Sequence, residues 1–332
     1  MGLAWQASDL RGVIALVPTP TKEGAEHWRT EDVVDLDETE RMIRAILQDG
    51  ATGVATNGTL GEMATLLREE WERFVAVVWE TVRAIDPDRP LFIGATTLGT
   101  RETISRLRYL RKLGVRGTLL GRPFWSQLAP EAIIAFYRDI AEGFPEIAVL
   151  LYDNPEAFKG PIPTPVYAAL ADSSTVIGVK YVSLTPKYRA DMDAVRGKIR
   201  LLPLESDWFW AWTLYPDEAL GCWSSSMLCG PEPVRYLAEA LERGDIEAAR
   251  WITHRIEWTY EPFLARQNFQ EFSRYNIPLE KIRFNAAGYV KAGPPLPPYH
   301  VVPENYRRGA LEHAARWRQL VSEVQARRAM LA

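Results

Sequence analysis

Short, uninterrupted apolar runs alternate with longer amphipathic stretches along the first two-thirds of the chain. The runs lack polar alternation, which is typical of parallel strands that are covered on both faces. Between them, apolar residues recur every three to four positions, which predicts helices. The predicted strands are Val13–Val17, Gly53–Thr56, Leu91–Ala95, Thr118–Leu120, Ile147–Tyr152, Val176–Lys180, Ile199–Leu204 and Ala219–Trp223. The clearest predicted helices are Leu36–Gln48, Glu69–Ile85, Thr100–Leu113, Pro130–Glu142 and Glu232–Arg243.

Eight strand signals with helices between them predict an α/β fold, a (β/α)8 TIM barrel. A doubly wound sheet would carry a glycine-rich phosphate loop, and the chain has neither GxGxxG nor GxxxxGK[ST]. After Arg243 the pattern is helical, interrupted by a proline-rich extended connector at Gly293–Pro298. We therefore expect residues 1–243 to form the barrel with the catalytic site, and residues 244–332 to form a C-terminal helical extension packed on it. The helices predicted in this tail are Asp245–Arg266, Leu279–Lys291 and Pro303–Ala329.

Composition removes several classes of protein. The 332 residues include 39 Lys and Arg against 43 Asp and Glu, so the net charge of −4 gives no basic footprint for nucleic acid. Two cysteines are too few for a disulfide scaffold or a zinc cluster. We see no signal peptide and no apolar run of the roughly 18 residues that a membrane span needs. We expect a cytoplasmic protein whose 12 Trp, 13 Tyr and 11 Phe include residues that line an apolar ligand pocket.

The chemistry of a TIM barrel lies at the C-terminal ends of its strands. Lys180 closes a strand there, and in a poorly hydrated barrel mouth desolvation disfavours the ammonium form, which frees the amine to attack a ketone. A lysine that reaches to solvent is the alternative. Tyr152 ends the neighbouring strand, where its phenol would relay protons or pack in the core. The segment Gly58–Glu62 offers backbone N–H groups for a carboxylate, with an ordinary turn as the alternative.

Two other signals compete with this interpretation. Asp35-Leu-Asp-Glu-Thr39 matches the D-x-D-x-T of haloacid-dehalogenase-type phosphatases, but no apolar strand precedes it, and a helix N-terminus explains its acidic residues better. Glu205 and Asp207 follow the seventh strand and offer an Mg²⁺ site of the kind that metal-dependent barrel aldolases use. Solvated or hydrogen-bonded carboxylates are the alternative. Four scattered histidines show no metal-binding spacing and are expected to be structural or exposed: His27, His254, His300 and His313.

Together, Gly58–Glu62, Tyr152 and Lys180 resemble the dihydrodipicolinate synthase / N-acetylneuraminate lyase superfamily. The resemblance extends from Val17-Pro-Thr-Pro20 to the tail. It implies a (β/α)8 barrel with a C-terminal helical region, class I pyruvate aldolase chemistry with Lys180 as the Schiff-base lysine, and a homotetramer. The Schiff base is covalent, so no metal and no organic cofactor is expected.

A branch of this superfamily is suggested by further segments: Tyr152–Phe158, Cys222–Ser225, Tyr275–Ile277, Leu279–Lys281, Ala287-Gly288 and Lys291–Pro294. They are similar to the hydratase-aldolases that act on trans-o-hydroxybenzylidenepyruvate or trans-2'-carboxybenzalpyruvate. The resemblance implies cleavage of an aryl keto acid to pyruvate and an aromatic aldehyde in polycyclic aromatic degradation. Leu60 replaces the second Thr of the family's usual GTTGE, which leaves backbone N–H groups and Thr59 to hold the pyruvate end.

The resemblance also implies residue roles. Tyr152 would relay protons with help from Thr59, and Asn154 would position the water or the new hydroxyl. Position alone gives Arg122 a role, because it follows the fourth predicted strand, where its guanidinium would pair with a ring carboxylate; this slightly favours the 2'-carboxy substrate, with a structural salt bridge as an equal alternative. Trp125 and Trp223 would wall the aryl ring. The remaining substrate-binding candidates are Gly58, Leu60 and Ser224.

Three other functions stay open. The alternatives are a different lyase or synthase of the superfamily, a metal-dependent barrel aldolase using Glu205 and Asp207, and a non-catalytic relative that binds keto acids.

Overall fold

The computed structural model describes residues 2–263 and 268–331. Its strands are β1 (Gly12–Leu16), β2 (Gly53–Ala55), β3 (Leu91–Gly94), β4 (Gly117–Leu120), β5 (Ala148–Tyr152), β6 (Val176–Lys180), β7 (Arg200–Leu202) and β8 (Gly221–Ser224). They form one sheet in the order β7-β6-β5-β4-β3-β2-β1-β8, with parallel pairing from β2 through β7. A parallel bridge between Leu204 and Trp223 joins the segment that follows β7 to β8. The eight strands and the helices between them form a TIM barrel, which confirms the predicted fold.

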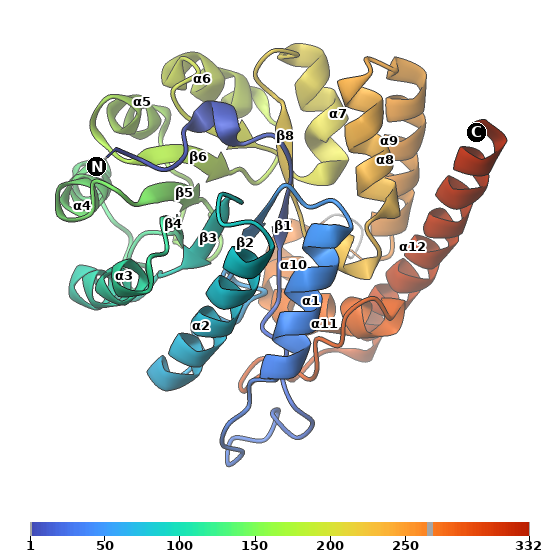
Figure 1. The fold of residues 1–332 in the computed structure, drawn as a ribbon, viewed down its shortest axis with the longest axis horizontal. Coiled ribbons are helices and arrows are strands. Elements are labelled where there is room, and N and C mark those ends of the chain that lie inside the picture. The colour runs from blue at the N-terminus through green and yellow to red at the C-terminus, as the bar shows by residue number, and fades with distance from the viewer. Residues whose placement is uncertain (1, 264–267, 332) are drawn as a thin grey trace. The chain divides into compact units, whose positions relative to one another are not determined.

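Helices follow the strands in sequence (Figure 1). They are α1 (Leu36–Gln48), α2 (Arg68–Ile85), α3 (Thr100–Leu113), α4 (Pro130–Gly143), α5 (Thr164–Ser173), α6 (Pro186–Val195), α7 (Glu205–Leu214), α8 (Glu232–Glu242), α9 (Ile246–Tyr260), α10 (Phe269–Arg274), α11 (Asn276–Ala287) and α12 (Glu304–Leu331). The five predicted barrel helices agree with α1, α2, α3, α4 and α8 to within one residue at each end.

The tail departs more from the prediction. Helix α11 begins at Asn276 and ends at Ala287, because Gly288 adopts a left-handed φ of 86° that terminates the helix. The predicted helix Asp245–Arg266 is α9 as far as Tyr260; residues 261–263 form a turn, so the prediction is wrong there, and residues 264–266 lie outside the described part of the chain. Helix α10 was not expected from the sequence.

The start of α1 explains the acidic motif at Asp35. The Asp35 carboxylate accepts a hydrogen bond of 3.0 Å from the backbone N–H of Glu38, so Asp35 is the N-cap. Asp37 and Glu38 occupy the first turn, where the helix dipole favours acidic side chains. The motif is therefore a helix start, as the sequence pattern indicated.

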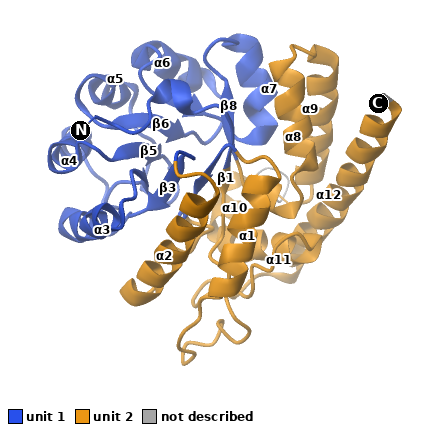
Figure 2. Ribbon diagram, in the orientation of Figure 1, with its two compact units in different colours: residues 1–14, 52–58, 88–223 blue, residues 15–51, 59–87, 224–332 orange. Residues whose placement is uncertain are grey.

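The chain divides into two compact units (Figure 2). Unit 1 comprises residues 1–14, 52–58 and 88–223, and unit 2 comprises residues 15–51, 59–87 and 224–332. Within unit 1, helices α3 to α6 follow one another along the outside of strands β3 to β6 (Figure 1). Within unit 2, α12 packs against α8, α9 and α11. The domain boundary expected after residue 243 stays a prediction.

Strand composition follows from burial on both faces. Every residue of β3, β4, β5 and β6 is buried, which is why these strands are continuous apolar runs. Among the described residues, no helix is both long enough and apolar enough to cross a membrane.

Candidate active site

Lys180 and Tyr152 are the last residues of two neighbouring strands. Strands β5 and β6 pair in parallel with Tyr152 opposite Lys180, so both side chains start from the same edge of the sheet. Lys180 is 7% exposed and Tyr152 is 2% exposed. The Nζ atom of Lys180 lies 5.1 Å from the centroid of the Tyr152 ring. The strand ends therefore bring a buried amine and a buried phenol together, as the sequence pattern predicted.

Trp223 presents the face of its indole to the Lys180 amine. Nζ lies 3.5 Å from the Trp223 ring centroid. The indole Nε1–H donates a 2.7 Å hydrogen bond to the carbonyl oxygen of Tyr181, and the backbone N–H of Trp223 donates to Pro203. Both ends of the residue are thus fixed. An aromatic face attracts a cation, so this arrangement suits a nitrogen that carries positive charge.

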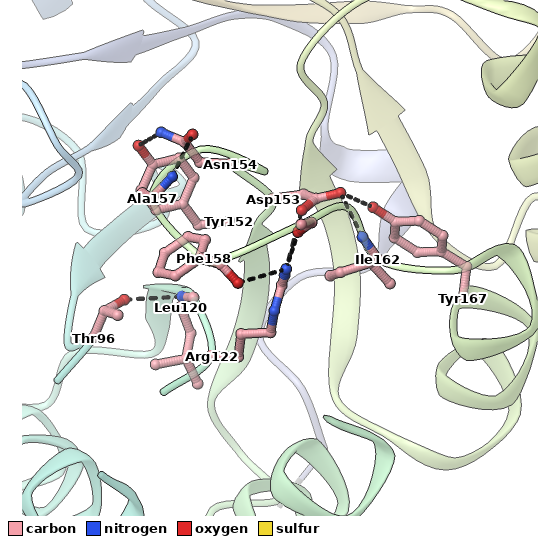
Figure 3. A network of polar contacts seen from close by, with 12 residues as sticks. Thr96, Leu120, Arg122, Tyr152, Asp153, Asn154, Ala157, Phe158, Ile162 and Tyr167 are labelled. Atoms are coloured by element: carbon pink, nitrogen blue, oxygen red, sulfur yellow. Dashed lines mark hydrogen bonds and ion pairs between the residues drawn. The ribbon is translucent and has the colours of Figure 1, made fainter. Parts of the chain in front are cut away.

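Asn154 is held against Tyr152 in the loop that follows β5 (Figure 3). Its Nδ2 donates a 3.1 Å hydrogen bond to the Tyr152 hydroxyl, and its Oδ1 accepts one from the N–H of Ala157. Phe158 packs edge-on to the Tyr152 ring at a centroid distance of 5.3 Å. The amide and the phenol therefore form one oriented polar pair.

Arg122 ties down the same loop (Figure 3). Its side chain is 3% exposed and forms an ion pair of 3.4 Å with Asp153. The guanidinium also donates to the carbonyl oxygens of Phe158 and Gly160. Asp153 in turn accepts a 2.9 Å hydrogen bond from the Tyr167 hydroxyl. These contacts are the structural salt bridge that the sequence left as the alternative role for Arg122.

Gly58 begins the turn after β2 beside the Tyr152 ring. A Cβ atom on Gly58 would lie 3.7 Å from Cε1 of Tyr152, which is ordinary contact. Strand β3 approaches the same point closely, since a Cβ on Gly94 would lie 2.4 Å from the carbonyl oxygen of Asn57. Glycine at position 94 therefore allows the end of β2 to sit against β3.

The rest of this turn belongs to unit 2. The N–H of Glu62 donates a 3.0 Å hydrogen bond to the carbonyl oxygen of Thr59, and the Thr19 hydroxyl donates one of 2.9 Å to Gly61. Leu60, which stands between Thr59 and Gly61 in the sequence, is buried. Ser224 is fully buried, and its hydroxyl accepts a hydrogen bond from the N–H of Met227.

Three candidates are placed differently from the Lys180 group. The Trp125 side chain is 80% exposed. Glu205 and Asp207 follow β7 as predicted and lie in the first turn of α7, and Asp207 accepts a hydrogen bond from the N–H of Leu184. Within residues 2–263 and 268–331, no group of three or more His, Cys, Asp or Glu is arranged to hold a metal ion.

Tyr181 and Asp191 support the site and were not identified from the sequence. The Tyr181 hydroxyl donates a 2.7 Å hydrogen bond to Asp191, and burial together with this carboxylate raises the pKa of Tyr181. Its carbonyl oxygen receives the Trp223 indole N–H. Tyr181 follows Lys180 directly, which is the only signal that the sequence offers. Asp191 lies in α6, away from any strand end.

Comparison with known proteins agrees with this geometry. The model of the dihydrodipicolinate synthetase family matches residues 10–308. The chain is 38% identical to a trans-2'-carboxybenzalpyruvate hydratase-aldolase of Nocardioides sp. (strain KP7), with 94% of each chain covered. It is 39% identical to a trans-O-hydroxybenzylidenepyruvate hydratase-aldolase of Pseudomonas putida, with 95% of each covered. A solved structure of PhdJ bound to substrate intermediate superposes with a TM-score of 0.93 at 39% identity, covering 97% of this chain and 99% of that one.

Proposed function

The chain belongs to the dihydrodipicolinate synthetase family, and from this membership we propose that it is a carbon–carbon lyase, a class I hydratase-aldolase. The substrate is an aryl-substituted benzalpyruvate, and the products are an aromatic aldehyde and pyruvate. One observation carries the proposal: a buried lysine amine at the end of β6 faces the Trp223 indole, with the Tyr152 ring on the adjacent strand.

The first step forms the Schiff base. The neutral Lys180 amine attacks the keto carbon, one proton is taken up from solvent, water leaves, and a protonated imine results. The indole face at 3.5 Å stabilises positive charge on this nitrogen. Backbone N–H groups of the turn that starts at Gly58, with the Thr59 hydroxyl, hold the carboxylate of the keto acid. Leu60 contributes only its backbone there.

The second step adds water. The protonated imine withdraws electrons through the conjugated double bond, so the benzylic carbon becomes electrophilic. Asn154 positions the water, because its amide is already oriented by Tyr152 and Ala157. The water loses a proton as the new C–O bond forms, and the electron pair of the alkene passes to the iminium to give an enamine. Protonation of the enamine carbon restores the iminium.

The third step breaks the carbon–carbon bond. Tyr152 relays the proton away from the benzylic hydroxyl, and the electron pair of the breaking bond moves into the iminium. An aromatic aldehyde departs, and the remaining pyruvate enamine is protonated and hydrolysed, which frees Lys180. The route through a covalent Schiff base needs neither a metal nor an organic cofactor.

Recognition of the ring is less specific in this proposal. Trp223 and the exposed Trp125 remain the aromatic candidates for the aryl group. We propose that Arg122 stabilises the loop after β5, because its guanidinium is paired with Asp153, Phe158 and Gly160. The proposal therefore covers both the 2'-carboxy and the o-hydroxy keto acid. The homotetramer and the cytoplasmic location remain predictions.

The test offers the purified protein both aryl keto acids and follows loss of substrate with release of aldehyde and pyruvate. We expect turnover of at least one substrate, and loss of both hydration and cleavage in Lys180→Ala. Lys198→Ala is the matched control, since this lysine is exposed and forms a surface ion pair with Asp172. Turnover above background in Lys180→Ala would contradict the Schiff-base assignment. Activity that EDTA abolishes would instead favour a metal-dependent aldolase, and binding without turnover a keto-acid-binding relative.

A further inference from the structure

A lysine of the tail is fully buried in unit 2. Lys281 of α11 places Nζ 2.6 Å from a carboxylate oxygen of Glu62, 3.0 Å from the hydroxyl of Thr21 and 3.0 Å from the carbonyl oxygen of Pro294. An ammonium has three N–H donors, so each has an acceptor. Burial lowers the pKa of Lys281, and the Glu62 carboxylate opposes this shift. The site pairs the two charges closely enough to keep both buried.

Glu62 closes the turn whose backbone is proposed to hold the substrate carboxylate. Its side chain is buried, and its second carboxylate oxygen accepts a 2.6 Å hydrogen bond from the N–H of Leu296. Its φ of 57° lies in the left-handed region, which is uncommon for residues other than glycine. The Lys281 ammonium on one carboxylate oxygen and the backbone N–H of Leu296 on the other therefore hold the end of this turn in a conformation that the backbone alone would not favour.

The proline-rich connector lies directly on Thr21. The N–H of Thr21 donates a 3.1 Å hydrogen bond to the carbonyl oxygen of Ala292. Gly293 has a φ of 70°, and a Cβ there would lie 1.9 Å from the carbonyl oxygen of Thr21. Three segments that are distant in the sequence thus converge on one amine: the turn ending at Glu62, Thr21 after β1, and the connector before α12.

We propose that Lys281 is a positioning residue for substrate binding: its ion pair with Glu62 fixes the turn 58–62 in the shape that receives the carboxylate of the keto acid. This inference rests on the proposed function, because it assumes that this turn binds a carboxylate. In this role the helical tail contributes to substrate binding, since α11 and the connector supply the partners of Glu62. Lys281 does not contact the reacting atoms.

A positioning role and a purely structural role of Lys281 predict different results for two ketones. Pyruvate and acetone both form an imine with Lys180, but only pyruvate carries the carboxylate. If the ion pair shapes the carboxylate site, its loss weakens the binding of pyruvate and leaves the binding of acetone unchanged. If the pair only stabilises the fold, the binding of both ketones weakens to the same extent.

The experiment measures borohydride trapping of the imine as a function of ketone concentration in the intact protein. In Lys281→Met and in Glu62→Gln we expect the half-saturating pyruvate concentration to rise at least about tenfold, with acetone changed less than about twofold. The double variant should be no worse than the worse single variant, because the two residues act as one unit. Arg255→Met, which removes an ion pair between α9 and α12, should leave the half-saturating concentrations of both ketones unchanged.

A gentler variant guards against loss of folding. Glu62→Asp keeps both charges and shortens the carboxylate's reach, so we expect a smaller effect that is still confined to pyruvate. Equal losses for both ketones in folded variants, or no change for either, would overturn the positioning role. Failure of the wild type to trap any ketone would instead overturn the proposed function, so the two failures are distinguishable.

Discussion

The Nζ atom of Lys180 lies 3.5 Å from the centroid of the Trp223 ring, and that ring is held in place by a hydrogen bond from its Nε1 to Tyr181. The amine that would form the imine is thus already seated over an electron-rich surface. Cation–π contacts contribute about 0.5–2 kcal/mol, which corresponds to roughly 2- to 30-fold in rate or equilibrium.

Replacing Trp223 tests this relationship. Trp223→Leu removes the aromatic face, and we expect imine formation with pyruvate to fall by roughly 2- to 30-fold. Trp223→Phe keeps a smaller face without the hydrogen bond to Tyr181 and should retain most of the rate. Rapid-quench borohydride trapping gives both rates. Equal damage in the two variants would show that the hydrogen bond or the bulk of the indole matters, and not its face.

Removing the Tyr152 hydroxyl should affect proton transfer. In Tyr152→Phe we expect cleavage to slow by about 10²- to 10⁴-fold, because the relay group is lost while the ring keeps its packing against Phe158. The measurement is single-turnover release of aldehyde, with Tyr299→Phe as a control at a partly exposed phenol. A rate close to wild type in Tyr152→Phe would assign the proton relay to another group.

Arg122 should act on stability and not on the choice of ring. Arg122→Leu leaves Asp153 as an uncompensated buried charge, which costs about 3–5 kcal/mol. We expect denaturant unfolding to show this loss, and kcat/KM to fall equally for 2'-carboxy and o-hydroxy substrates. The control is Arg116→Leu, which removes an exposed ion pair worth at most about 1 kcal/mol. A selective loss for the 2'-carboxy substrate at unchanged stability would restore the ring-binding role.

His313 should make the fold sensitive to mild acid. Burial and the charge of Arg283 hold the pKa of His313 well below 6.5, so the native state keeps this histidine neutral while the unfolded chain gains a proton. The free energy of unfolding should therefore fall as the pH drops below about 6.5, by at most about 1.4 kcal/mol per pH unit. Urea titrations between pH 7.5 and about 5 measure the slope. His313→Gln should flatten it, and an unchanged slope in that variant would assign the effect elsewhere.

The sequence predicted the barrel because its strands are buried on both faces and therefore appear as continuous apolar runs. Catalytic residues of a parallel barrel lie at the C-terminal ends of its strands, so the sequence predicted that Lys180 and Tyr152 lie close together. The register between β5 and β6 agrees, since it pairs Tyr152 with Lys180. Helix α7 was harder to predict from the sequence, because the consecutive aromatic residues Trp208, Phe209 and Trp210 obscure any helical periodicity. The sequence pattern consequently predicts no helix at Glu205 and Asp207.

Long-range polar contacts could not be predicted. Arg122 donates to two backbone carbonyl groups, which have no side-chain signature in a sequence. Lys281 lies in a tail helix, where a lysine is ordinarily exposed, and its partner Glu62 belongs to the turn after β2. Such pairs depend on how distant segments meet in space, and a single sequence carries no pattern for them.

The proposed mechanism depends on a covalent intermediate at Lys180. The most direct measurement is mass spectrometry of peptides after incubation with pyruvate and sodium borohydride. We expect one reduced pyruvate on the peptide that contains Lys180, absent from Lys180→Ala and retained in Lys198→Ala. An unmodified Lys180 in protein that turns over an aryl keto acid, or a label on a different lysine, would contradict it.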